Sequence, residues 1–149
     1  MVGLPGAGKT TRARELERAR RALRLTPDEW IPALFGPDPA SATLDSARDP
    51  VESLQWEVAA RALTLGIDVI LDFGFWSRSE RDDYRARAAA LGAGSELHFL
   101  DVPLAELRRR LTARNATRPP DTFLVTAAQL DEWAAKFQPP APDELRPRP

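Results

Sequence analysis

The chain has 149 residues, a formal net charge of −1, 43% hydrophobic residues and 29% charged residues. These values are typical of one soluble globular domain and predict no overall positive field that would collect nucleic acid. The absence of cysteine and the single histidine, His98, exclude disulfides, thiolate nucleophiles and zinc sites built from Cys or several His. No apolar run reaches the roughly 18 residues of a membrane span. The first nine residues do not resemble a signal peptide, so we expect a cytoplasmic protein.

The first quarter of the chain predicts a glycine-rich loop, a helix, a strand and a short helical turn. The helix begins at Lys9 and is rich in arginine and alanine. Residues 22–26 (ALRLT) are a short strand candidate that ends at Pro27, and residues 30–35 fit one helical turn.

The next segment predicts a surface loop and then an amphipathic helix. Residues 35–50 contain several prolines among small polar residues, which favours a loop. Asp49 at the N-cap, Pro50 at the first helical position and Glu52 three residues after the cap predict a helix start. Gly66 is expected to end this helix.

The second half continues the alternation of strands and helices. Residues 67–73 (IDVILDF) have a continuous apolar centre, which is typical of a strand covered on both faces. Ser77 with Glu80 forms a capping box that opens a helix to about Leu91, and residues 96–102 are the next strand candidate. The last predicted elements are a helix from about 103 to 115, a helix opened by a Thr126–Gln129 capping box, and a proline-rich tail, 139–149, that is extended or disordered.

This alternation predicts an α/β fold layered around a short parallel sheet. Its first and last strands are expected to be truncated. Only Met1 and Val2 stand before the glycine-rich loop, and the tail is not strand-like.

The glycine-rich loop carries the strongest chemical signal. Residues 3–10 (GLPGAGKT) fit the pattern G-x-x-x-x-G-K-[ST] at every fixed position. Glycines let backbone N–H groups curl around a phosphate, and the following helix directs its positive end at the same place. In this pattern Lys9 reaches the β- and γ-phosphates and the Thr10 hydroxyl binds Mg²⁺, so ATP and Mg²⁺ are the expected cofactors. The predicted phosphate-binding residues are Gly3, Leu4, Pro5, Gly6, Ala7, Gly8, Lys9, Thr10 and Thr11; the alternative is a glycine-rich turn that matches by chance.

Four stretches together carry a family resemblance: GLPGAGKTT, TPDEW, DVILDFGFWSRSER and LRRRLTARN. In these stretches the chain resembles the small P-loop kinases that include phage-type polynucleotide kinase, chloramphenicol phosphotransferase and zeta-type toxins. The likeness runs from Gly3 to about Phe137. It implies a three-layer P-loop NTPase fold over residues 1–138, followed by the tail. It also implies ATP-dependent transfer of the γ-phosphoryl group to a hydroxyl of a small-molecule acceptor.

Asp28 is the predicted general base. It directly follows the strand candidate 22–26, and ligands of α/β sheets gather beyond the carboxyl ends of strands. A carboxylate there can accept the proton of an acceptor hydroxyl, and the resemblance implies this role. The alternative is that Asp28 only caps a helix starting at Glu29, which is the natural control residue.

Asp72 is the predicted second metal residue beside Thr10. It ends the apolar run 69–71, a position suited to holding magnesium or its water shell. A simple strand-end cap is the alternative. Asp68, before the apolar run, is expected to be merely exposed.

Arginines near residue 110 are the predicted lid over the phosphates. Arg110 and Arg114 are four residues apart and share a helix face, and Arg118 lies in the loop beyond. The resemblance implies a lid at about 108–122, with Arg114 acting in catalysis and Arg110 and Arg118 binding nucleotide. Arginine suits this task because its planar fork grips phosphate oxygens. The alternative is a solvated basic face.

The acceptor is expected to be a small molecule rather than a nucleic acid. Polynucleotide kinases carry a threonine–asparagine pair after the matching aspartate, whereas here Phe73 and Gly74 stand there, followed by Phe75 and Trp76. The aromatic residues line an apolar acceptor pocket or pack in the core. Two other hypotheses remain: a 5′-hydroxyl polynucleotide kinase, and a nucleotide-binding domain without transferase activity.

Overall fold

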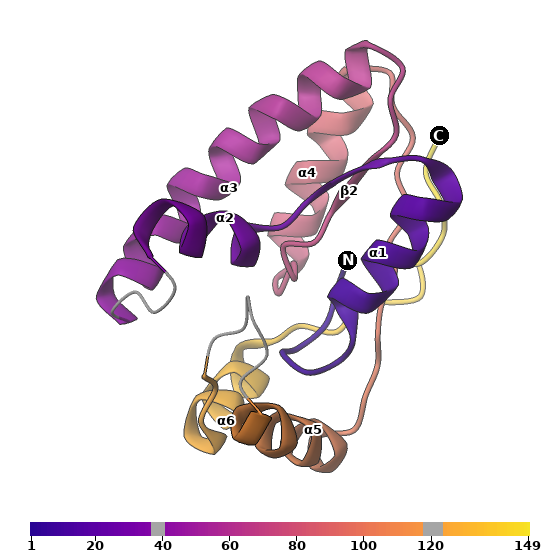
Figure 1. Ribbon diagram of the computed structural model, residues 1–149. Helices are drawn as coiled ribbons and strands as arrows, with labels where there is room; N and C mark the ends of the chain where they lie inside the picture. The colour runs from indigo at the N-terminus through magenta and orange to yellow at the C-terminus, as the bar shows by residue number, and fades with distance from the viewer. Residues whose placement is uncertain (37–40, 118–123) are drawn as a thin grey trace.

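The computed structural model describes residues 1–36, 41–117 and 124–149, with the side chains of 41–45 left undescribed. Figure 1 shows the order and arrangement of the helices and strands. They are α1 (Lys9–Arg20), β1 (Leu23–Leu25), α2 (Pro27–Phe35), α3 (Ser41–Thr64), β2 (Val69–Leu71), α4 (Arg78–Ala90), α5 (Leu104–Thr117) and α6 (Ala127–Lys136).

The sheet is parallel and short, as predicted. β1 pairs with β2 so that Leu23 lies opposite Val69 and Leu25 opposite Leu71. Val2 extends this arrangement through single parallel bridges to Gly74 on one side and Phe99 on the other. The order in space is therefore β1, β2, the Met1–Val2 segment and the segment around Phe99.

The predicted strand over residues 96–102 is wrong in extent. In the structure this segment forms only the bridge at Phe99 and an antiparallel bridge between Ser95 and Arg148. The physical reason is the shortness of the neighbouring segment, Met1–Val2. A strand needs a partner along its length, and Val2 offers one residue for pairing on this side.

The predicted loop is wrong over residues 41–50, and the helix start at Asp49 is wrong too, because α3 begins at Ser41 and Pro50 lies inside it. Residues 37–40 of the predicted loop lie outside the described residues. An interior proline removes a helical hydrogen bond and clashes with the preceding turn. Here packing overrides that cost. Ala47 and Val51, on either side of Pro50, are buried together with Ile31 of α2.

Helices lie on both faces of the sheet and produce three layers. On the face covered by α1, the buried cluster consists of Met1 together with Ala13 and Leu16 of α1 itself, and Ile70 packs against it. On the opposite face, α3 and α4 cover an aromatic cluster. Helices α5 and α6 form a separate lower block beneath the glycine-rich loop (Figure 1).

Helices α4 and α6 begin at the N-caps that the sequence predicts. Ser77 accepts a hydrogen bond from the Glu80 backbone and opens α4. Thr126 and Gln129 form the complete reciprocal box that opens α6.

The proline-rich tail is not extended throughout: it turns at residues 142–144 and lies against α4. Glu144 is 1% exposed and accepts two hydrogen bonds, of 2.7 and 3.0 Å, from the Arg81 guanidinium of α4. Arg81 also donates to the backbone carbonyls of Phe75 and Gln138. Disorder, the second possibility that the sequence left open, is therefore wrong.

No helix within the described ranges has both the length and the apolar character that crossing a membrane requires.

Candidate active site

The glycine-rich loop folds as a tight turn that leads directly into α1. Gly6 and Gly8 have φ angles of +82° and +96°, which side-chain-bearing residues rarely adopt. A Cβ on Gly6 would also lie 3.2 Å from Leu111 Cγ of α5. The loop closes with a hydrogen bond from Ala7 N to Leu4 O, and Lys9 begins the helix. The first N–H groups of α1 therefore face the loop without helical acceptors, as a phosphate site requires.

Lys9 lies at the centre of the site. Its ammonium donates a 3.1 Å hydrogen bond to Leu4 O, back across the loop. Burial lowers the pKa of Lys9 below its usual value of 10.5. Four charged side chains lie close enough to act on the same pKa, two acidic residues that raise it and two basic residues that lower it: Asp72, Asp28, Arg48 and Arg114. The predicted catalytic residues Asp28 and Arg114 therefore lie near enough to Lys9 for their charges to act on it.

Thr10 and Asp72, the two predicted metal residues, are in direct contact. The Thr10 hydroxyl donates a 2.7 Å hydrogen bond to Asp72 Oδ2. Asp72 is 5% exposed, and its other oxygen, Oδ1, is buried without a hydrogen-bond partner among the described residues. A buried carboxylate oxygen without a donor is the kind of atom that a cation or its bound water satisfies.

These residues fit a nucleotide and a magnesium ion. The positive φ angles of the glycine turn are those that let backbone N–H groups curl around phosphate oxygens, and Thr10 and Asp72 supply hard oxygen ligands beside the turn. The described ranges contain no cluster of three or more His, Cys, Asp or Glu residues suited to a metal. Magnesium does not require one, because it typically takes one or two protein oxygens together with phosphates.

Asp28 lies in the first turn of α2 and is held by an arginine from α3. The N-cap of α2 is Thr26, so the alternative reading of Asp28 as the cap is wrong. Arg48 donates a 2.6 Å hydrogen bond to Asp28 Oδ1 and a 3.0 Å hydrogen bond to Glu52 Oε1. Asp28 keeps 47% of its side chain exposed. It is thus both oriented and accessible.

Arg48 and Glu52 were not recognised as site residues from the sequence. Arg48 falls inside the segment predicted as a loop, and Glu52 was assigned to a capping box. In α3 they form an i,i+4 ion pair on either side of Pro50. Burial raises the pKa of Glu52 to about 7, with Arg48 opposing the change and Glu80 and Asp49 adding to it. The i,i+4 spacing of Arg and Glu was the signal that could have revealed the pair.

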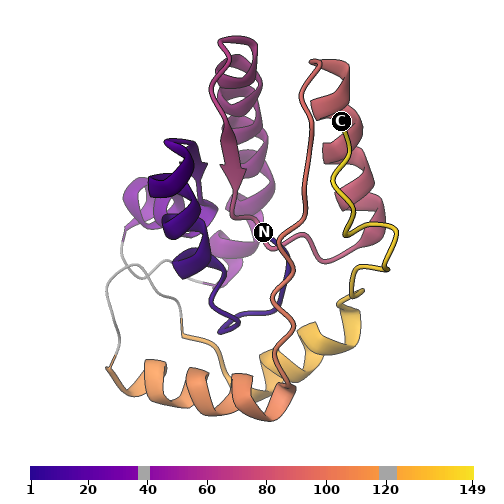
Figure 2. The same cartoon turned by 90° about the vertical axis from the view of Figure 1, so that its right-hand side faces the viewer.

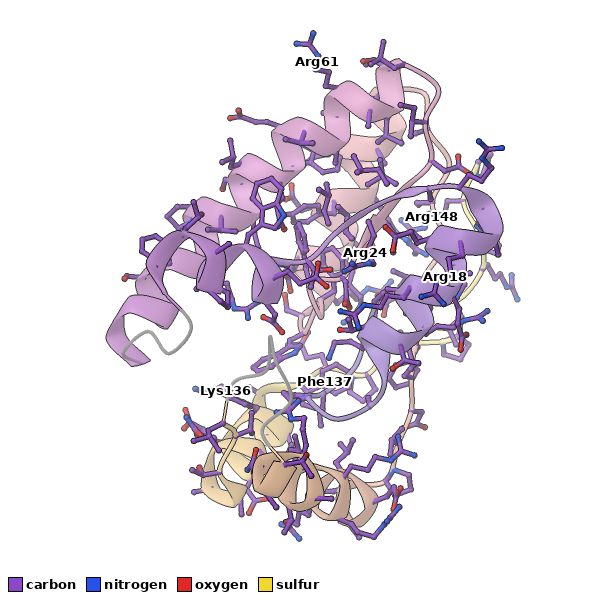
Figure 3. All side chains as sticks on the ribbon, viewed as in Figure 1. Arg18, Arg24, Arg61, Lys136, Phe137 and Arg148 are labelled. Carbon is purple, nitrogen blue, oxygen red and sulfur yellow. The ribbon has the colours of Figure 1, made fainter. Side chains whose placement is uncertain are left out.

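Glu29, the neighbour of Asp28, faces a different set of residues. It accepts hydrogen bonds from Arg14 at 2.9 Å and Arg24 at 3.0 Å. Figure 3 shows Arg24 between α1 and α2, where it also meets Glu17 of α1. Partial burial alone would raise the pKa of Glu29, but the two arginines outweigh it and lower that pKa. The ion pairs of Glu29 therefore link α2 to α1 and to β1.

The predicted lid arginines occupy different environments. Arg114 is half-buried, burial lowers its pKa, and Asp28 opposes that change. Arg110 is exposed and pairs with Glu106 at 2.7 Å on its own helix. Arg118 lies outside the described residues. Within the described part of the lid, Arg114 is thus the arginine that the structure brings toward Asp28 and Lys9.

The aromatic residues after Asp72 divide between core and site. Phe73 and Phe75 are 7% and 6% exposed and pack against Tyr84, so the acceptor-pocket reading is wrong for these two. Trp76 is half-buried and lies against Trp133 of α6, with ring centroids 5.6 Å apart. A Cβ on Gly74 would meet Trp76 at 3.3 Å and Lys9 at 3.9 Å, which places Trp76 beside the lysine.

Comparison with known proteins agrees with this geometry. No curated protein sequence matches the chain closely enough to count as a relative. A family model described as an AAA domain (AAA_33) matches residues 1–140, which include the glycine-rich loop, Asp28, Asp72 and Arg114. Because that match spans most of the chain, and because the loop, the parallel sheet and the Thr10–Asp72 pair are those of a nucleotide-binding P-loop domain, the chain belongs to the AAA_33 family.

Proposed function

We propose that the protein is an ATP-dependent kinase that transfers the γ-phosphoryl group to a hydroxyl of a small-molecule acceptor. The observation that carries this proposal is the convergence of Lys9, Asp28 and Asp72. The Lys9 cation in the phosphate loop lies near enough to the half-exposed carboxylate of Asp28 and to the buried carboxylate of Asp72, which is bonded to Thr10, for both to act on its charge. Phosphoryl transfer needs little beyond such positioning and charge stabilisation.

Each residue has a role that its environment supports. Lys9 and the loop N–H groups hold the β- and γ-phosphates, and Thr10 with Asp72 holds Mg²⁺, which neutralises phosphate charge when bound. Asp28 accepts the proton of the acceptor hydroxyl while that oxygen bonds to the γ-phosphorus and the bond to the ADP oxygen breaks. Arg114 stabilises the charge on the transferred group.

Arg48 positions the proposed base. It holds Asp28 through Oδ1 alone and is itself anchored by Glu52, which is 12% exposed. The hydrogen bond from Arg48 fixes the direction of the Asp28 carboxylate, and 47% of the Asp28 side chain stays exposed. Because Arg48 and Glu52 line the same side as Asp28, we propose that the acceptor binds next to them, with Trp76 as an apolar wall.

The test is phosphate transfer from ATP labelled at the γ-position to a panel of small alcohols, with a 5′-hydroxyl oligonucleotide included. Asp28→Asn keeps the shape of the side chain and removes its basicity. We expect it to bind ATP like the parent protein and to transfer phosphate at least ~10²-fold more slowly.

Glu29→Gln is the matched control, because Glu29 pairs with Arg14 and Arg24 instead. Its transfer rate should stay close to that of the parent. Full activity of Asp28→Asn on a genuine acceptor would remove Asp28 as the base. ATP binding by the parent without transfer to any acceptor would favour the non-catalytic nucleotide-binding domain.

A further inference from the structure

The chain between β2 and α4 has a strained backbone beside the phosphate loop. Gly74 has a φ angle of +101°, and Phe75, which carries a side chain, has a φ angle of +47°. Residues other than glycine rarely adopt such angles, and those that do are concentrated at functional sites. A conformation of this kind persists only where the surrounding contacts hold it. We call residues 74–76 the tryptophan turn.

The tryptophan turn is bonded to the phosphate loop on one side and to α4 on the other. Gly3 N donates a 3.2 Å hydrogen bond to Gly74 O. Arg81 of α4 donates a 3.2 Å hydrogen bond from Nη1 to Phe75 O, and the Phe75 side chain is buried in the aromatic cluster. The conformation of the turn is therefore fixed relative to the phosphate loop.

Trp76 is held by its backbone and by its ring. Trp76 N donates to Glu80 Oε2 and Gln138 N donates to Trp76 O, each at 2.9 Å. Its ring packs on Trp133 of α6, with 5.6 Å between the ring centroids. Figure 2 shows α6 and the chain after it close to the segment that joins β2 to α4. The position of the Trp76 indole is thus set by the protein itself, before any ligand binds.

The indole nitrogen of Trp76 lies beside the Lys9 side chain. A Cβ on Gly74 would lie 3.3 Å from Trp76 Nε1 and 3.9 Å from Lys9 Cε, so both groups occupy the same side of Gly74. The ammonium of Lys9 is one bond beyond that carbon. Among the residues that the structure describes, no acceptor is bonded to Trp76 Nε1. An indole N–H can only donate, and a buried one usually has a partner, so this half-buried N–H is suited to a ligand oxygen.

The γ-phosphate of ATP is the ligand group that fits this place. In the phosphate-loop pattern, the loop N–H groups surround the α- and β-phosphates, and the lysine reaches the β- and γ-phosphates. Trp76 lies outside the loop, on the segment that follows Asp72, but next to Lys9. A donor in this position is therefore placed to meet the phosphate that projects beyond the loop.

We propose that the Trp76 indole N–H donates a hydrogen bond to an oxygen of the γ-phosphoryl group, so that Trp76 distinguishes ATP from ADP. This inference rests on the proposed use of ATP but not on the identity of the acceptor. The contact adds an uncharged donor to the Lys9 cation, and the tryptophan turn holds that donor in place while charge develops on the transferred group. The N–H edge of the ring contacts phosphate, and its carbon atoms remain the apolar wall of the acceptor site.

The test compares the affinities of a non-hydrolysable ATP analogue and of ADP, each with Mg²⁺, for the parent, Trp76→Phe and Trp133→Phe by calorimetry. Phenylalanine keeps an aromatic ring but has no N–H. We expect Trp76→Phe to bind the ATP analogue about tenfold more weakly than the parent and to bind ADP as the parent does. Trp133→Phe is the matched control, because it removes the other indole N–H of the same ring pair. It should bind both nucleotides like the parent.

Proton NMR of the unmodified chain gives a second measurement, which stands even if Trp76→Phe does not fold. The chain has four tryptophans and therefore four indole N–H signals. The signal of Trp76 is identified by its nuclear Overhauser contacts with Trp133. It should move downfield when the ATP analogue binds and stay near its free position with ADP, because a hydrogen bond to a phosphate oxygen deshields the proton.

Three results would overturn this inference and leave the proposed kinase standing. An equal loss of affinity for both nucleotides in Trp76→Phe means that Trp76 only supports the shape of the phosphate loop. Unchanged affinity for both nucleotides, with a higher KM for the acceptor, means that the N–H serves the acceptor instead. An indole signal that responds equally to ADP and to the ATP analogue excludes a contact specific to the γ-phosphate. Failure of the parent to bind either nucleotide overturns the proposed function, and this inference with it.

Discussion

The Thr10 hydroxyl and the Asp72 carboxylate are joined by a 2.7 Å hydrogen bond although they lie 62 positions apart in the sequence. This contact connects the start of α1 to the end of β2, the two elements that a P-loop fold places side by side. It leaves Asp72 Oδ1 buried and without a partner in the described part of the chain. The pair therefore joins the phosphate loop to an oxygen suited to magnesium.

Asp72→Asn tests this pairing. Asparagine keeps an oxygen that accepts from Thr10, but it removes the negative charge that a cation requires. We expect the affinity for Mg²⁺ in the presence of ATP to fall roughly 10–100-fold. ATP binding without Mg²⁺ should change little. The control is Asp68→Asn, since Asp68 is exposed. An unchanged magnesium dependence in Asp72→Asn would refute the metal assignment.

Arg114 and Arg110 provide a matched pair for the lid. Arg114 is half-buried toward Asp28, whereas Arg110 is exposed and tied to Glu106. Arg114→Ala should lower kcat at least about tenfold and leave ATP affinity nearly intact, since it acts on charge that develops during transfer. Arg110→Ala should leave both quantities near the parent values. Equal losses of kcat in the two variants would contradict the distinction.

Much of the site was predictable because its signals are local. The spacing of glycines, Lys9 and Thr10 is a contiguous pattern, and the N-cap at Ser77 and the capping box at Thr126 each involve residues only three positions apart. Such patterns depend on backbone geometry within one turn, so the structures they predict do not depend on which residues pack around them.

The errors arose where tertiary contacts outweigh local preference. Pro50 predicts a helix start, yet the packing of Ala47 and Val51 on Ile31 carries α3 through it. For the same reason Arg48 was missed, because its role depends on α3 running past Asp28. The segment around Phe99 has the composition of a strand but lacks the long neighbour that a strand needs.

Glu52 predicts a pH dependence of stability. Its pKa is about 7 in the folded protein and about 4.5 when unperturbed. Between these values the folded protein binds more protons than the unfolded chain, so this group makes stability fall as pH rises from 4.5 to 7. The effect is at most about 3 kcal/mol.

Urea unfolding at pH 5 and pH 7.5 measures this contribution. Glu52→Gln should gain stability relative to the parent on going to the higher pH, because the buried charge is gone. Glu57 lies on the exposed face of the same helix, so the stability of Glu57→Gln should change with pH as that of the parent does. If the free energies of unfolding of Glu52→Gln and the parent differ by the same amount at both pH values, Glu52 does not titrate in this range.

The buried Arg81–Glu144 pair predicts a stability role for the tail. Glu144→Ala leaves the Arg81 guanidinium buried without its carboxylate, which should cost about 3–5 kcal/mol in the free energy of unfolding. The neighbouring Asp143→Ala removes only an exposed pair with Arg78 and should leave the free energy of unfolding close to that of the parent. Chemical denaturation of both variants checks the difference. Similar losses in the two would mean that the tail does not depend on the buried pair.

The most direct test of the account is the affinity for ATP of the parent, Lys9→Ala and Lys136→Ala, measured by calorimetry in the presence of Mg²⁺. Lys9 and Lys136 are the two lysines of the chain. Lys136 lies on α6, pairs with Glu132 at 2.6 Å and is 64% exposed (Figure 3). We predict that Lys9→Ala binds ATP at least about 100-fold more weakly, because it removes the cation at the centre of the phosphate loop, and that Lys136→Ala binds like the parent. Equal affinities in all three proteins would contradict the nucleotide site and the kinase proposed from it.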